Sequence, residues 1–389
     1  MENKERALAH VEKIEWIRPI EGADNIELIG VLGWFCIAKK GEFNVGDMAV
    51  YIEIDSKCPE TDERFAFLAN KKFKVKTMKL GKFKVISQGL ALPLSLFPEL
   101  QDRNIGDDVT EALKITYASE EDAARKTNKI DPNAKYKSMA KRRPKLFANP
   151  IVRRIMRYSI GRKIMFLLFG RKKDNPKKFP DWIVKTDETR IENAPFYLQS
   201  TEKWIKTEKC DGTSCTFAVD RLKKGKNKFD FIVCSRNVRQ ADREQACYHE
   251  SNIYWELADK YDIEKILTQF ATENDYNRVV LQGEGVGSVQ GNPYKFTENK
   301  LFVFNLIIDG TRLGTVEMAD FCKSHGLTSV PIIDTAYELP KTMEEMKLEA
   351  DGYSELNPKV KREGFVYRDI SGQKSFKNVS REYLLKHNG

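Results

Sequence analysis

The sequence has few features that would place the chain outside the cell or across a membrane. Its seven cysteines form no C-x-x-C pair and no cysteine–histidine cluster with zinc spacing, so we expect reduced thiols, with no disulfide framework and no zinc site. The first residues are charged and lack an apolar signal core. The longest apolar run, Ile164 to Phe169, is too short to span a bilayer. We therefore expect an intracellular protein, cytoplasmic or nuclear, with no membrane partner.

Acidic residues are nearly absent from one stretch near the middle of the chain. Between Lys135 and Lys178 there are sixteen lysines and arginines and a single acid, Asp174, which makes a net charge of +15 (16 − 1). The whole chain carries +9, so the other residues together carry −6 (9 − 15). Because the positive charge is concentrated locally, this stretch is expected to meet a polyanionic partner.

Residues 1–115 have the pattern of a small β-barrel. At 389 residues the chain is long enough for two domains, each with its own core. In this first part short apolar segments alternate with turn residues, and two lysine-rich segments flank Gly81 as in a hairpin. Strands are predicted at 26–38, 48–54, 73–76, 83–85 and 89–94. So many short strands favour an OB-like nucleic-acid-binding module.

The lysines of the predicted hairpin have two interpretations. Lys74, Lys76, Lys82 and Lys84 alternate with apolar residues along the two segments. A face of this kind suits contact with a nucleic-acid backbone. Lysines on an edge hairpin also protect it against pairing with strands of other molecules. Both interpretations stay open, and the four lysines are candidate nucleic-acid contacts.

Residues 116–178 are interpreted as a basic connector. We predict the start of a capped helix over 119–126 and a single basic helix from Pro150 to Phe169. Such a helix can lie on a membrane surface, act as a solvated linker or contact nucleic-acid phosphates. We favour phosphate contact, with Arg153 and Arg154 as candidates, because the neighbouring residues are also basic.

Residues 179–389 mix strands and helices, which favours an α+β domain. Strands are predicted at 214–219, 229–234, 278–282, 301–308 and 364–367, and helices at 242–249, 253–261, 263–272, 316–325 and 342–350. The fold class expected for the whole chain is α+β, with an OB-like β-barrel, then the partly helical connector, then antiparallel sheets with flanking helices.

Within this last part, Lys209-Cys210-Asp211-Gly212 has the composition of a nucleophilic site. A lysine is nucleophilic only as the neutral amine, so its pKa must be lowered by burial or by a nearby cation. Asp211 would lie near the reacting centre, where it can hold a divalent metal, and Gly212 lets the backbone approach a nucleotide. Four residues of this kind also occur by chance in surface turns, so support must come from elsewhere in the chain.

Three residues that follow or lie on predicted strands could act with this lysine. Arg236 can grip a ribose or a phosphate oxygen. Glu284 lies between glycines at a strand end, where it can bind a sugar hydroxyl or a metal-bound water. Phe304 belongs to an aromatic strand face and can stack on a purine. Two of them also have an ordinary explanation: Glu284 as an exposed acid in a glycine-rich turn, and Phe304 as a core aromatic.

Two further groups lie close to the end of the chain. Glu363 stands before Gly364 at a strand start, and Lys374 and Lys377 supply two cations for phosphate. In this order and spacing the motifs resemble those of the covalent nucleotidyltransferase superfamily of ligases and capping enzymes. Lys209 to Gly212 resembles motif I, Phe304 motif III, Glu363-Gly364 motif IV, and Lys377, with Lys374, motif V.

The layout resembles one branch of that superfamily, the Deinococcus-type RNA ligases. DNA ligases and capping enzymes carry an OB domain after motif V, whereas only 12 residues follow Lys377 here (389 − 377), so we expect no such domain. A barrel-like module instead precedes the ligase part, and Arg190 lies upstream of the nucleophile. The resemblance covers about 1–115 and 179–389, and Asn305 replaces the aspartate common in motif III.

The resemblance implies an ATP-dependent RNA ligase that seals 3′-OH and 5′-phosphate ends at nicks through a lysyl-AMP intermediate. RNA or an RNA-containing nicked duplex would be its partner, and we expect a monomer. The implied catalytic residues are Lys209, Asp211, Glu284, Glu363 and Lys377. The implied ATP contacts are Glu208, Lys209, Gly212, Arg236, Glu284, Phe304, Lys374 and Lys377. Asp211, Glu284 and Glu363 would hold Mg²⁺ or Mn²⁺ through water.

Two other functions stay open at this point. An RNA capping guanylyltransferase has the same motifs and uses GTP in place of ATP. A non-catalytic nucleic-acid-binding protein would rely on the OB-like module and the basic connector alone. The intact K-x-D-G motif argues against the second of these.

Overall fold

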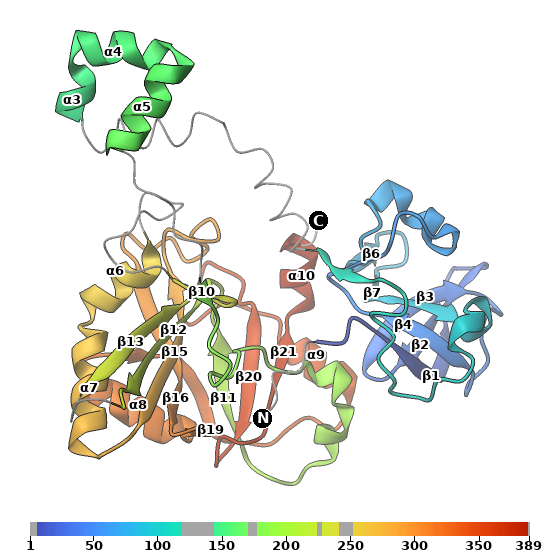
Figure 1. Cartoon of the computed structure of the whole chain (residues 1–389). Coiled ribbons are helices and arrows are strands. Elements are labelled where there is room, and N and C mark those ends of the chain that lie inside the picture. Colours follow the sequence, from blue (N-terminus) through green and yellow to red (C-terminus); the bar gives the residue numbers. More distant parts are fainter. Residues whose placement is uncertain (1–5, 119–143, 170–176, 224–227, 241–251, 388–389) are drawn as a thin grey trace.

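The structure, a computed structural model shown in Figure 1, describes residues 6–118, 144–169, 177–223, 228–240 and 252–387. Its elements are strands with some helices, so the predicted α+β class is confirmed. The helices predicted at 119–126 and 242–249 lie outside the described residues.

The N-terminal module is built on a five-stranded antiparallel sheet in the order β3-β2-β1-β4-β8. The first strand, β1, pairs with β4 along its first half and with β2 along its second, and its register shifts between Ile14 and Trp16. One strand thereby joins both halves of a curved sheet, as expected for the predicted OB-like barrel. The strands are β1 (Ala9–Pro19), β2 (Ile26–Val31), β3 (Trp34–Lys39), β4 (Met48–Ile52), β5 (Ser56–Lys57), β6 (Met78–Leu80), β7 (Val85–Ser87), β8 (Leu90–Pro93) and β9 (Thr116–Tyr117). Three 3₁₀ helices accompany them: Glu63–Lys71, Leu94–Leu96 and Pro98–Leu100.

The lysine-rich hairpin has a different register from the predicted one. Its strands are β6 and β7, which pair Met78 with Ser87 and Leu80 with Val85. The segment 73–76, predicted as the first strand, instead runs beside 55–58, where the backbone N–H of Val75 donates to the carbonyl of Ser56 at 2.9 Å. The prediction was wrong because apolar–lysine alternation marks an extended segment without identifying its partner.

The C-terminal part contains two sheets, antiparallel except for the parallel pair β16–β18. The larger has the order β10-β14-β13-β12-β15-β16-β17, with β18 beside β16, and the smaller has the order β19-β11-β20-β21. The larger comprises β10 (Lys177–Lys178), β12 (Thr213–Arg221), β13 (Phe229–Cys234), β14 (Val238–Arg239), β15 (Arg278–Val286), β16 (Lys300–Ile308), β17 (Thr311–Arg312) and β18 (Thr328–Ser329). The smaller comprises β11 (Trp204–Lys209), β19 (Ile332–Tyr337), β20 (Gly364–Asp369) and β21 (Ser375–Val379).

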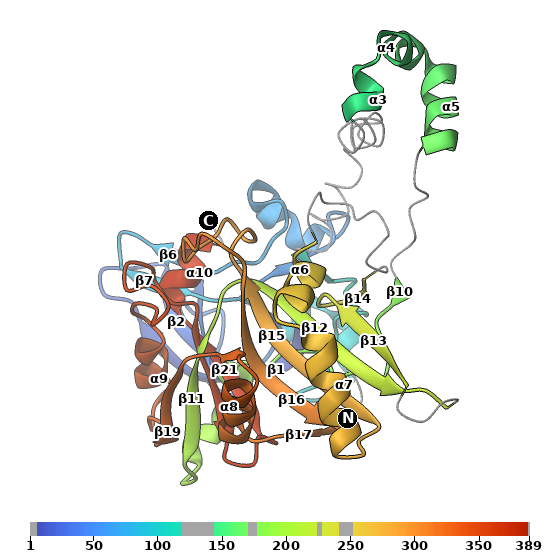
Figure 2. The same ribbon diagram turned by 90° about the vertical axis from the view of Figure 1, so that its left-hand side faces the viewer.

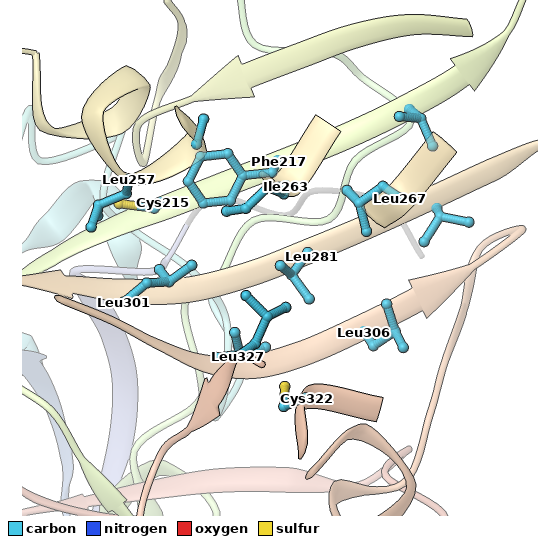
Figure 3. Packing of buried hydrophobic residues seen from close by; sticks show 14 of the residues in the cluster. Cys215, Phe217, Leu257, Ile263, Leu267, Leu281, Leu301, Leu306, Cys322 and Leu327 are labelled. Atoms are coloured by element: carbon cyan, nitrogen blue, oxygen red, sulfur yellow. The ribbon is translucent and has the colours of Figure 1, made fainter. Parts of the chain in front are cut away.

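Helices cover the larger sheet and bury its main core. Figure 3 shows Phe217, Leu281 and Leu306 of the strands against Leu257 and Leu267 of two helices, all buried. Burial of these apolar side chains holds the larger sheet against its helices and so fixes one wall of the site described below. The helices of this part are α6 (Ile253–Lys260), α7 (Ile263–Glu273), α8 (Thr315–Ser324), α9 (Met343–Glu349) and α10 (Arg381–His387), with 3₁₀ helices at Ile191–Asn193 and Pro195–Gln199.

The connector contains three short helices. The last two cover the residues for which the sequence predicts one long helix. The three helices are α3 (Pro144–Ala148), α4 (Pro150–Arg157) and α5 (Ser159–Phe169). Tyr158 separates α4 from α5 with an extended backbone (φ −92°, ψ 142°), so the prediction of one continuous helix was wrong. In Figures 1 and 2 the three helices lie apart from the sheets. Within the described ranges no helix is both long and apolar enough to cross a membrane.

The N-terminal module packs against the C-terminal part through a buried interface. Trp34 and Tyr51 share one apolar cluster with Val379 and Leu384, which lie more than 300 residues later in the chain. The N–H of Gly33 donates to the carbonyl of Glu192 at 2.8 Å. The two parts are therefore held together by core-like contacts and not only by the connector.

Candidate active site

A cleft of about 480 Å³ lies where the two C-terminal sheets meet the N-terminal module, a volume typical of small-molecule sites. Lys209 is the last residue of β11 in the smaller sheet, and Thr213 begins β12 in the larger sheet. The K-x-D-G motif therefore forms the loop that crosses from one sheet to the other. Its residues line the cleft.

Strand register brings Glu363 to Lys209. Lys209 pairs with Gly364 across β11 and β20, and the Glu363 carboxylate lies 2.8 Å from the Lys209 Nζ. Gly364 has φ +149°, and a Cβ there would lie 2.1 Å from the carbonyl oxygen of Asn378. Only glycine fits this position, which explains why Glu363 is followed by glycine.

The charge state of Lys209 differs from the sequence expectation. Burial by itself would lower the pKa of Lys209, but Glu363, Glu284 and Asp211 outweigh it and raise the pKa above its ordinary value. Of the two causes expected to lower this pKa, burial is therefore not sufficient in the free cleft, because three carboxylates surround the amine.

Glu284, one of these carboxylates, has a raised pKa. It lies on β15, and burial, together with the negative charges of Glu363 and Asp211, raises its pKa to about 8 despite the attraction of Lys209. Carboxylate oxygens are the ligands preferred by Mg²⁺ and Mn²⁺. Among the described residues no three His, Cys, Asp or Glu side chains come close enough together to hold an ion directly. The donor set therefore suits an ion that keeps its waters.

In the same cleft, Asp187 pairs with two cations expected to bind phosphate. Its carboxylate lies 2.6 Å from Lys377 Nζ and 3.1 Å from Arg236 Nη2. Burial would raise the pKa of Asp187, but Lys377 and Arg236 outweigh it and lower that pKa. Burial also lowers the pKa of Lys377 to about 8. Asp187 was not among the predicted site residues.

Phe304 lines the cleft from β16. Its carbonyl accepts a hydrogen bond from Arg368, which also pairs with Glu188 at 3.0 Å. The next residue, Asn305, is buried and donates to Gln282 Oε1 at 2.8 Å. An amide at this position makes a neutral hydrogen bond in the core, whereas an aspartate would bury a charge.

Close packing restricts Gly212, and hydrogen bonds hold the Glu208 side chain in place. A Cβ at Gly212 would lie 2.4 Å from the carbonyl oxygen of Gly285, so close backbone approach requires glycine here. Glu208 is buried, and its carboxylate accepts hydrogen bonds from Ser354 Oγ and from the Glu355 N–H. Both residues line the cleft, although the Glu208 carboxylate is engaged with the 354–355 loop.

Several predicted site residues are not brought to the cleft. Lys374 is exposed and pairs with Glu202 at 2.8 Å, so Lys377 is the motif V lysine that lines the cleft. Lys74 and Lys76 lie before β6, while Lys82 and Lys84 lie in the β6–β7 turn. Arg153 and Arg154 lie on α4, apart from the sheets.

Other residues line the cleft without having been predicted. Arg6, Asp55 and Tyr117 come from the N-terminal module, and Tyr383 comes from α10. Asp55 lies 3.4 Å from Arg190, which links the module to the cleft wall. No local pattern marks the first three, because only packing of the module brings them to the site.

Comparison with known proteins identifies relatives of both parts of the chain. A family model of an OB-fold domain matches residues 8–94, and an RNA ligase model matches residues 202–385. The structure of Naegleria gruberi RNA ligase with PPi is 30% identical, with a TM-score of 0.74 over 98% of this chain and 99% of that chain.

Two lysine mutants of the same Naegleria gruberi enzyme are equally similar. One, solved with ATP and Mn, is 30% identical with a TM-score of 0.74, and the other, solved with AMP and Mn, is 30% identical with a TM-score of 0.75. Both alignments cover 98% of this chain and 99% of the other. No curated protein matches significantly.

Proposed function

This chain belongs to the RNA ligase family, and on that premise we propose that it is an ATP-dependent enzyme that seals RNA 3′-OH and 5′-phosphate ends at nicks in duplexes. The observation that carries the proposal is the group around Lys209, whose amine lies 2.8 Å from Glu363 in a cleft also lined by Glu284, Phe304 and Lys377. The related ligase solved with ATP and Mn supports ATP and a divalent cation as its cofactors.

The proposed reaction has three phosphoryl transfers. The Lys209 amine attacks the α-phosphorus of ATP, an N–P bond forms, and pyrophosphate leaves. The 5′-phosphate of the RNA then attacks the AMP phosphorus, which breaks the N–P bond and leaves an RNA-adenylate. Finally the 3′-OH attacks the 5′-phosphorus, a phosphodiester forms, and AMP leaves.

The residues of the cleft have distinct roles in this scheme. Lys377 and Arg236 bind phosphate oxygens, and Asp187 keeps the two cations side by side. Phe304 stacks on adenine. Lys374 has no part in ATP binding in this proposal, because it lies outside the cleft.

Lys209 has to lose its proton before it can attack. Asp211, Glu284 and Glu363 would hold a hydrated Mg²⁺ or Mn²⁺. The charge of such an ion would offset the three carboxylates and so lower the pKa of Lys209. Glu363, whose carboxylate lies 2.8 Å from the amine, can accept the proton.

We further propose that the chain divides into an OB-like module (1–115), a connector (116–178) and an adenylyltransferase domain (179–389), in the Deinococcus-type layout. The OB-fold match at 8–94, ahead of the ligase match at 202–385, supports this order. In this division the lysines of the β6–β7 region, by which we mean Lys74, Lys76, Lys82 and Lys84, contact the RNA backbone.

Mass spectrometry of the purified protein after incubation with ATP and Mg²⁺ tests the proposal. The expected result is one AMP adduct on Lys209, absent from Lys209→Ala. That variant should still seal a nick that already carries the 5′-adenylate, because the final step needs no nucleophilic lysine. Lys359→Ala, a change at an exposed lysine outside the cleft, is the matched control.

Two outcomes would contradict the proposal. Labelling by GTP in place of ATP would identify a capping-type guanylyltransferase. Absence of any covalent nucleotide, with nick binding intact, would identify a non-catalytic nucleic-acid-binding protein.

A further inference from the structure

The helix pair α4–α5 combines strong positive charge with exposed apolar side chains. Residues 144–169 contain six lysines and arginines and no acidic residue. Arg153 and Arg157 lie one helical turn apart on α4, and Arg162 lies on α5. Positive charge alone would let these helices bind any polyanion, so it does not identify the partner.

The apolar side chains on the same helices narrow the choice of partner. Ile160, Ile164, Leu167 and Leu168 have the spacing i, i+4, i+7 and i+8, which places them on one face of α5. Leu167 is 83% exposed, Ile160 70% and Leu168 65%. Ile151 on α4 is 70% exposed. These side chains gain nothing from contact with phosphates, so a backbone-binding role leaves them unexplained.

The exposure of these residues does not come from loose packing between the helices. Gly161 is buried, and a Cβ there would lie 2.1 Å from the carbonyl oxygen of Ile155, so α4 and α5 approach closely at their junction. Met165 is only 6% exposed. The helix pair therefore buries Gly161 and Met165 and presents most of its other described large apolar side chains to solvent.

We propose that α4–α5 binds an anionic lipid surface. Its apolar face would enter the boundary between headgroups and acyl chains while its arginines meet lipid phosphates and carboxylates. This combination of an apolar face and cations without acids is the pattern of helices that lie in a membrane interface. The expectation from sequence that there is no membrane partner, and that Arg153 and Arg154 contact nucleic acid, is replaced by this proposal.

The position of the helices agrees with such a role. Figures 1 and 2 show α3–α5 away from the two sheets that form the cleft. None of their residues lines the cleft. Lipid binding would therefore leave adenylation of Lys209 unchanged and would hold the enzyme at a surface.

Sedimentation of the full-length protein with vesicles tests the proposal. Vesicles of phosphatidylcholine with phosphatidylserine should bind the protein, and vesicles of phosphatidylcholine alone should bind it far more weakly. Arg153→Gln/Arg154→Gln should lower the partition coefficient roughly 25-fold, or about fivefold for each arginine. Ile160→Ser/Leu167→Ser should lower it at least tenfold, because each apolar side chain loses its transfer into the interface.

The matched control is Val45→Ser/Ile370→Ser, which removes two apolar side chains that are 64% and 67% exposed elsewhere on the molecule. It should bind vesicles like the unchanged protein. AMP-adduct formation measured on every variant shows that the ligase fold is intact.

Four results would overturn the proposal. The first is no binding of the full-length protein to the phosphatidylserine vesicles. The second is binding that survives Ile160→Ser/Leu167→Ser, which would mean charge attraction alone. The third is nick affinity that falls in Arg153→Gln/Arg154→Gln without any vesicle binding, which would assign the helices to RNA. The fourth is a dimer in sedimentation that only Ile160→Ser/Leu167→Ser abolishes, again without vesicle binding, which would assign them to a second copy of the chain.

Discussion

The two motif V lysines show how environment separates residues that look alike in sequence. Lys377 is buried, faces the cleft and lies 2.6 Å from Asp187. Lys374, three residues earlier, is half exposed and paired with Glu202 at the surface. A buried cation in a cleft is a far stronger phosphate ligand than a solvated one, because water screens it less.

Lys377→Ala should therefore lower the rate of Lys209 adenylation by roughly 10²–10³, the usual cost of losing one preorganised transition-state contact. Lys374→Ala, the matched control, should stay within a few-fold of the unchanged enzyme. Single-turnover labelling with ATP measures both. Equal losses in the two variants would show that the cleft lysine is not the specific phosphate ligand.

At the scale of elements, the start of β20 sets the position of Glu363. Gly364→Ala would force a Cβ to within 2.1 Å of the Asn378 carbonyl at a positive φ. The strain should cost about 1–3 kcal/mol of stability and displace Glu363, which reduces adenylation as well.

Gly81→Ala is the control for this change, because no atom lies within 4 Å of a Cβ at Gly81. It should leave both properties unchanged. Thermal unfolding and ATP labelling of the two variants check the prediction. Full adenylation by Gly364→Ala would mean that Glu363 does not depend on this strand register.

The β6–β7 region offers a second prediction at this scale. Replacing Lys74, Lys76, Lys82 and Lys84 by Gln should weaken nick binding and flatten its dependence on salt. Each lost phosphate contact reduces the slope of log affinity against log salt by about 0.9 on duplex DNA, and somewhat less on single strands. Adenylation should not change, because none of the four lines the cleft.

Nick binding across a salt series measures this slope. Lys13→Gln/Lys39→Gln/Lys40→Gln/Lys114→Gln, four exposed lysines elsewhere in the same module, is the matched control. An identical slope for both quadruple variants would assign the β6–β7 lysines to edge protection, the other interpretation of their pattern.

At the scale of the whole molecule, a buried charge pair lies between the two parts of the chain. Lys347 and Glu192 are each about 1% exposed at their side chains, with Nζ and Oε1 3.9 Å apart. The Lys347 Nζ also donates to Gln88 at 3.1 Å and lies 4.5 Å from the ring centre of Phe35, both in the N-terminal module. Removing that module would expose both this charged pair and the apolar cluster around Val379. Point variants therefore test the role of the charged pair more cleanly than truncation does.

Lys347→Met should destabilise the protein by about 3–5 kcal/mol, because Glu192 would be left buried without its cation. Lys347→Met/Glu192→Gln should recover most of this loss, since neither partner then carries a charge. Urea unfolding at neutral pH measures both variants. A double variant as unstable as the single one would mean that packing, and not charge, explains the effect.

The same lysine predicts a dependence of stability on pH. Burial lowers the pKa of Lys347 from 10.5 to about 8. Between pH 8 and 10.5 the unfolded chain therefore binds a proton that the folded chain does not, so this lysine makes stability increase with pH across that window. Lys347→Met/Glu192→Gln should lack this contribution, which unfolding measured at several pH values will reveal.

The sequence alone was sufficient to predict the features that depend on short motifs. Lys209, Asp211 and Gly212 are close in space because they are adjacent in the chain. The α+β class and most strands followed from local alternation, which acts over a few residues. The motif order was enough to indicate a ligase, because each motif occupies one strand or turn.

Tertiary structure decided everything that depends on contacts between distant segments. It separated Lys377 from Lys374, joined Arg236 to Asp187, and brought Arg6 to the cleft from the start of the chain. It also raised the pKa of Lys209, because it brings Glu363, Glu284 and Asp211 together from three separate segments. Such contacts arise only when packing closes long loops, and no local periodicity records which segments will meet.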